Sequence, residues 1–196
     1  MKTIFSFFFL LSLVVIALVL QDTFSGNIGF CQIDLFLVPV VFCFGALVLS
    51  LPSALFFGLV TGALEGLMTL SFHAHRAEIG IGWFVFFFIA WAFLLQFVTE
   101  LTGGIRWELH ALGSALFTAS LLAGEWILIS WHRGSFSISS MTIVLIAIPS
   151  AFSLLLAPLL YYSLQFLLPP SGKVVGDRIV SASPIKNRIN FFDRAT

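Results

Sequence analysis

The chain has 196 residues, of which 60% are hydrophobic and only 9% are charged, and its mean hydropathy is +1.10. Soluble domains have roughly a quarter of their residues charged, so this composition excludes a water-soluble globular protein. Nine basic residues balance nine acidic residues, and this neutral total gives no indication of nucleic acid as a partner. The composition therefore predicts an integral membrane protein in which the positions of the few charges carry the information.

Six apolar runs predict membrane-spanning helices. A membrane helix needs about 20 mostly apolar residues to cross a hydrocarbon layer of roughly 30 Å. We therefore expect an all-α, polytopic six-helix transmembrane bundle over residues 1–170, and we expect the last helix to be kinked or tilted because it contains two prolines. The predicted helices cover residues 4–20, 35–51, 52–70, 79–98, 110–131 and 141–168.

The first run has a second interpretation, because Lys2 followed by a long apolar stretch is also how a secretory signal peptide begins. This run is longer than a usual signal core, and no Ala-x-Ala cleavage site follows it. We expect a retained helix. A cleaved signal peptide stays open as the alternative, and it would leave five spans.

The distribution of basic residues predicts the orientation, since Lys and Arg in short loops stay in the cytoplasm. With six spans, the N-terminus, the loop around Arg106 and the tail at residues 171–196 share one side. That side carries most of the basic residues, whereas Arg76 and Arg133 lie on the other. We therefore expect both termini to be cytoplasmic and the basic tail to be a disordered, solvated extension.

Two ionisable groups, Glu65 and Glu125, lie inside apolar runs, where each costs about 2.5–3.5 kcal/mol on insertion scales. At 1.5 Å per residue, both lie roughly 8–9 Å below the outer ends of their helices. Asp34 lies at the outer end of the second run. We expect Asp34, Glu65 and Glu125 to form a partner-binding or ligand-binding pocket that opens outward. The alternative is structural, with the carboxyl groups neutral or hydrogen-bonded between helices.

The third run contains a small-xxx-small pattern, Gly58-Leu-Val-Thr-Gly62, which lets two helix backbones approach closely. Gly66 extends the same face by one turn. The pattern predicts a packing seam formed by Gly58, Gly62 and Gly66, with Glu65 beside it rather than toward lipid.

Catalytic and metal-binding patterns have little support. The chain has no Gly-x-Ser-x-Gly, no His-Glu-x-x-His and no glycine-rich phosphate loop. His73 and His75 resemble part of a metal site, but alternating histidines at a membrane surface are more often interfacial. Cys31 and Cys43 would lie on the order of 18 Å apart along a helix, too far for a disulfide. We expect no catalytic residue, no metal and no cofactor; an intramembrane enzyme using His73 and Glu125 is the weakest alternative.

The order of these features resembles the MreD family of bacterial rod shape-determining proteins. The resemblance covers roughly residues 33–168 and differs at Ile33, where the family usually has Pro, and at Glu65, where it usually has Asp. The matching features are Asp34 before an apolar helix, the stretch from Gly58 to Glu65, Gly80-Ile81-Gly82 at the start of the fourth run, and the end of the sixth run from Ala157 to Tyr162.

The resemblance implies a fold similar to the six-helix substrate-binding subunits of energy-coupling-factor vitamin transporters. It also implies a non-catalytic component of the bacterial inner membrane, which acts in cell elongation with MreC, the actin-like MreB and the peptidoglycan synthases. The alternative from another class is a transport subunit that binds a small, vitamin-type or cationic molecule in a pocket near Glu65 and Glu125.

Overall fold

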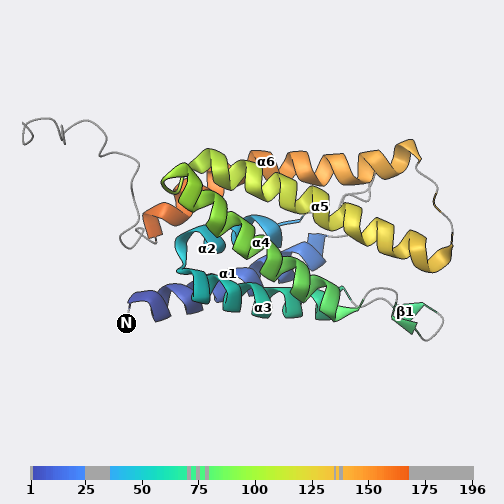
Figure 1. Cartoon of the computed structure of the whole chain (residues 1–196), viewed down its shortest axis with the longest axis horizontal. Coiled ribbons are helices and arrows are strands. Elements are labelled where there is room, and N and C mark those ends of the chain that lie inside the picture. Colours follow the sequence, from blue (N-terminus) through green and yellow to red (C-terminus); the bar gives the residue numbers. More distant parts are fainter. Residues whose placement is uncertain are drawn as a thin grey trace, which may run out of the picture.

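The computed structural model describes residues 2–24, 36–69, 72–73, 76–77, 80–134, 136 and 139–167. The described helices form an up-and-down bundle, and the start of the first helix and the end of the last lie toward the same end of it (Figure 1). A two-residue antiparallel strand pair, with Phe72 opposite Ala77, lies between the third and fourth helices. The elements are α1 (Lys2–Phe24), α2 (Val38–Val48), α3 (Leu51–Met68), β1 (Phe72–His73), β2 (Arg76–Ala77), α4 (Ile81–Thr102), α5 (Trp107–Arg133) and α6 (Ser140–Leu167).

Five of the described helices, all except α2, are long and apolar enough to cross a membrane. This confirms the prediction of a multi-pass, helical membrane protein. The tail at residues 171–196 lies outside the described residues.

The second helix is shorter than the predicted range of residues 35–51. At 11 residues, α2 is about 16 Å long, roughly half of the hydrocarbon thickness. It ends because the backbone is extended at Leu49 and Ser50, and α3 then begins with Pro52 in its first turn, where the missing amide hydrogen removes no helical bond. Hydropathy alone does not reveal this break, since the flanking residues are apolar.

The short α2 is the core of the bundle. All residues from 38 to 47 are buried, as expected of a helix that is apolar on every side. Phe42 of α2 contacts three neighbouring helices, with ring centroids 5.9 Å from Phe57, 4.7 Å from Phe88 and 5.3 Å from Phe117. One side chain therefore joins α2 to α3, α4 and α5.

The glycine face of α3 lies directly against the backbone of α4. A Cβ atom added at Gly62 would lie 2.8 Å from the carbonyl oxygen of Phe84 and 2.9 Å from the Cα atom of Val85, and one at Gly58 would lie 3.1 Å from the carbonyl oxygen of Phe88. Gly66 continues this contact against Ile81 and Phe84. Any side chain larger than hydrogen at the centre of the face would push the two backbones apart.

Large aromatic side chains separate α4 from α5 on the opposite side. Trp83, Phe87 and Trp91 follow one another along α4, and the rings of Phe87 and Trp91 lie 5.3 and 5.4 Å from that of Phe117 on α5. A Cβ atom at Gly124 of α5 would lie 2.5 Å from the Trp83 ring. Trp83 therefore packs between α4 and α5.

We predict that Gly62→Ala destabilises the bundle, whereas Gly82→Ala does not. The new methyl group at position 62 would press on main-chain atoms of α4, and overpacking of this kind costs about 1–3 kcal/mol. Gly82 is a matched control because it is also helical and a Cβ atom there meets nothing within 4 Å. Thermal unfolding of both purified variants in detergent checks the prediction, and equal midpoints would contradict the α3–α4 seam.

Candidate functional site

Gln96 of α4 donates hydrogen bonds to backbone carbonyl groups at the end of α2. Its buried amide nitrogen donates hydrogen bonds to the carbonyl oxygen of Ala46 and, at 2.8 Å, to that of Leu49. The last carbonyl groups of a helix have no partner within it, and hydrocarbon offers none. Gln96 therefore supplies donors to two carbonyl groups, one in the last turn of the short helix and one directly after it.

His110 of α5 is bound to the same central helix. Its fully buried ring lies 3.0 Å, at Nε2, from the carbonyl oxygen of Val40. Since a carbonyl oxygen only accepts, Nε2 carries the hydrogen. The ring packs between Phe44 and Tyr161, with centroids 5.8 Å from each, so His110 connects α2, α5 and α6.

We use the name α1–α3 polar cluster for Gln21 of α1, for Glu65 of α3, to which Gln21 bonds, and for Thr61, which lies one helical turn before Glu65 on α3. Glu65 is only 1% exposed, and its Oε1 accepts a hydrogen bond of 3.1 Å from Nε2 of Gln21. Within the described part of the chain, Oε2 of Glu65, Oε1 of Gln21 and Oγ1 of Thr61 are buried without a hydrogen-bond partner. Because buried polar atoms without partners are rare in proteins, this cluster is the candidate site.

The structure describes two of the three residues of the predicted acidic pocket, Glu65 and Glu125, and places them on different helices. Asp34 lies outside the described residues. Glu65 binds Gln21 of α1, whereas Glu125 lies partly exposed on α5. In the described residues, α3 and α5 are not in contact, while α2 and α4 each contact both. Glu65 and Glu125 are thus on separate sides of the central helices.

The residues considered for metal binding and for a disulfide are only partly described. His75 and Cys31 lie outside the described residues, and for His73 only the backbone is described. The described part of the chain holds no group of three or more His, Cys, Asp or Glu side chains arranged for a metal ion. Cys43 is a free, buried thiol inside α2.

Sequence reasoning missed two members of these polar groups. Because the first apolar run ends at residue 20, Gln21 was expected in a loop. In the structure α1 continues to Phe24, and Gln21 lies on this helix within hydrogen-bond distance of Glu65. Gln96 interrupts an otherwise apolar run, and the cost of an unpaired amide in hydrocarbon was the available signal that it binds a neighbouring helix. No sequence pattern identified the carbonyl groups that accept its hydrogen bonds.

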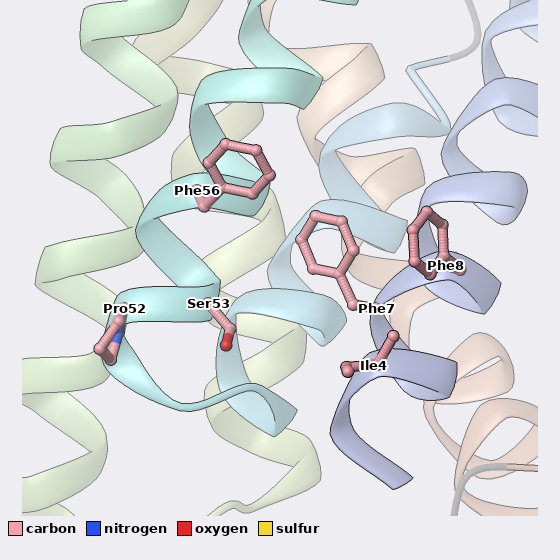
Figure 2. A pocket seen from close by; sticks show the side chains of 6 residues that line it. All are labelled: Ile4, Phe7, Phe8, Pro52, Ser53 and Phe56. Carbon is pink, nitrogen blue, oxygen red and sulfur yellow. The ribbon is translucent and has the colours of Figure 1, made fainter. Parts of the chain in front are cut away.

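An apolar groove lies at the other end of α1 (Figure 2). It has a volume of about 400 Å³, and Phe7 and Phe56 stack across it with ring centroids 5.6 Å apart. Ser53 is the one lining residue with a polar side chain, and it bonds Ser50 at 3.1 Å. The groove is therefore distinct from the α1–α3 polar cluster. Its lining is Ile4, Phe7, Phe8, Pro52, Ser53 and Phe56.

Comparison of the chain with models of protein families, with curated proteins and with solved structures finds no match.

We predict that Gln96→Leu lowers the stability of the bundle. The substitution nearly preserves side-chain volume but leaves the carbonyl groups of Ala46 and Leu49 buried without donors, at about 1–3 kcal/mol each. Gln165→Leu on α6 is the control, since Gln165 makes no hydrogen bond in the described part of the chain. Thermal unfolding in detergent should show a lower midpoint for Gln96→Leu alone, and a midpoint equal to that of the control would refute the capping role.

Proposed function

We propose that the chain is a non-catalytic component of a bacterial inner-membrane complex for cell elongation, acting with MreC, MreB and the peptidoglycan synthases. The sequence resemblance to the MreD family, carried by Asp34, by the stretch from Gly58 to Glu65 and by Gly80-Ile81-Gly82, supports this proposal. In this arrangement both termini face the cytoplasm, in keeping with the distribution of basic residues.

The observation that carries the proposal is the use of polar side chains inside the bundle. Gln96 and His110 bind backbone carbonyl groups of α2. The hydroxyl oxygen of Thr118 on α5 forms a 3.0 Å hydrogen bond with that of Ser153 on α6. These bonds hold the helices in one arrangement. A scaffold needs this property, because its partners recognise fixed helix faces.

The outward face of α6 offers such a surface. Leu155, Leu159 and Phe166 are 75%, 65% and 90% exposed, and α6 contacts only α2 and α5 among the described elements. In a bilayer this apolar face meets either lipid or a transmembrane helix of a partner. The proposal assigns part of it to the partner helices of the elongation complex.

A second candidate is a membrane subunit that binds a small molecule for transport. The α1–α3 polar cluster favours it, because Oε1 of Gln21 and Oε2 of Glu65 are buried and have no hydrogen-bond partner in the described residues. Such a subunit would associate with transporter ATPases rather than with cell-shape proteins.

Depletion of the protein in its native cell tests the proposal. We expect rod-shaped cells to become round, and we expect MreC and MreB to co-purify with the tagged protein from undepleted cells. Complementation by Gly82→Ala should restore rods, whereas Gly62→Leu should not, because it separates α3 from α4. Unchanged cell shape on depletion would contradict the proposal, and co-purification of transporter ATPases would favour the second candidate.

A further inference from the structure

The α1–α3 polar cluster lies where two parallel helices end. Gln21 is three residues before the end of α1 at Phe24, and Glu65 is three residues before the end of α3 at Met68. The two helices run in the same direction through the bundle (Figure 1). Each helix C-terminus carries a partial negative charge of about half an elementary charge. The C-termini of α1 and α3 therefore both favour a cation bound between them.

The described residues supply no full positive charge to the cluster. Glu65 accepts its one side-chain hydrogen bond from the neutral amide of Gln21, and no described Lys, Arg or His side chain binds it. The N-terminus of α4 packs against Gly66, but it contributes only about half a positive charge. A carboxyl group that is 1% exposed is either protonated or balanced by a positive charge, because an isolated buried charge is very costly.

The unpartnered atoms of the α1–α3 polar cluster are all oxygens, whereas the other buried polar atoms without partners in the described residues are ring nitrogens of Trp83, Trp91 and His110. The oxygens are a carboxylate oxygen of Glu65, the amide oxygen of Gln21 and the hydroxyl oxygen of Thr61. Thr61 and Glu65 are one helical turn apart and therefore neighbours on one face of α3, and Gln21 bonds to Glu65 directly. Oxygen ligands of these types suit hard cations.

We propose that Gln21, Thr61 and Glu65 form a binding site for a small monovalent cation, Na⁺ or K⁺, between the ends of α1 and α3. One carboxylate balances one positive charge, whereas divalent cations such as Ca²⁺ usually take several carboxylates. A water molecule would satisfy the hydrogen bonds but would leave the charge of Glu65 uncompensated. The bound cation links α1 to α3, and this role is independent of the function proposed above.

Cation-dependent stability of the whole chain in lipid nanodiscs tests the site. The unfolding midpoint is measured against increasing NaCl or KCl, with choline chloride added to hold the ionic strength constant. Because a ligand that binds only the folded state stabilises it, we expect a saturable rise in the midpoint with Na⁺ or K⁺ and none with choline. The absence of a saturable rise with either metal ion would overturn the proposal, and this is the result expected if only water or a proton occupies the cluster.

Variants locate the response. Glu65→Gln should abolish the cation-dependent rise in the unfolding midpoint. Thr61→Val and Gln21→Leu should each raise the half-saturating cation concentration by about tenfold or more. Glu100→Gln, at an exposed position of α4, should keep the wild-type response. If Glu65→Gln responds like the wild type, the site is wrong. If that variant does not fold, unaltered half-saturation in both Thr61→Val and Gln21→Leu would likewise overturn the proposal.

Discussion

The hydrogen bonds from Gln96 to the end of α2 are the constraint on which the rest of the bundle depends. A half-length helix in the centre of a membrane protein has terminal carbonyl groups that neither its own backbone nor lipid can satisfy. Gln96 donates to Ala46 and Leu49, and His110 donates to Val40. These bonds set the rotation of α4 and α5 about their axes, because each side chain must point at α2.

Once α4 is oriented, its two sides determine the spacing of its neighbours. One side meets Gly58, Gly62 and Gly66 and admits α3 at backbone distance. The other side carries Trp83, Phe87 and Trp91 and keeps α5 at the distance of aromatic rings. The bundle thus consists of two closely packed pairs, α3 with α4 and α5 with α6, which are joined through α2.

The sequence predicted the long helices because each has a sustained apolar run, and it singled out the three glycines because their spacing is local. It overestimated α2, since hydropathy does not record the extended backbone at Leu49 and Ser50. The sequence did not reveal the partner of Glu65 for a related reason: depth along a helix is readable from residue number, but the direction of a side chain depends on packing. Glu65 therefore matched Glu125 in expected depth, although it binds Gln21 on another helix.

A tryptophan scan of Val38–Val48 is the most direct test of the central position of α2, with the yield of monodisperse protein in detergent as the measurement. We expect tryptophan to lower the yield at every buried position of α2, because no face of this helix meets lipid. Tryptophan at Leu155, Leu159 or Phe166 of α6 should leave the yield unchanged, since these residues face outward. A face of α2 that tolerates tryptophan at every third or fourth position would contradict the central position of this helix.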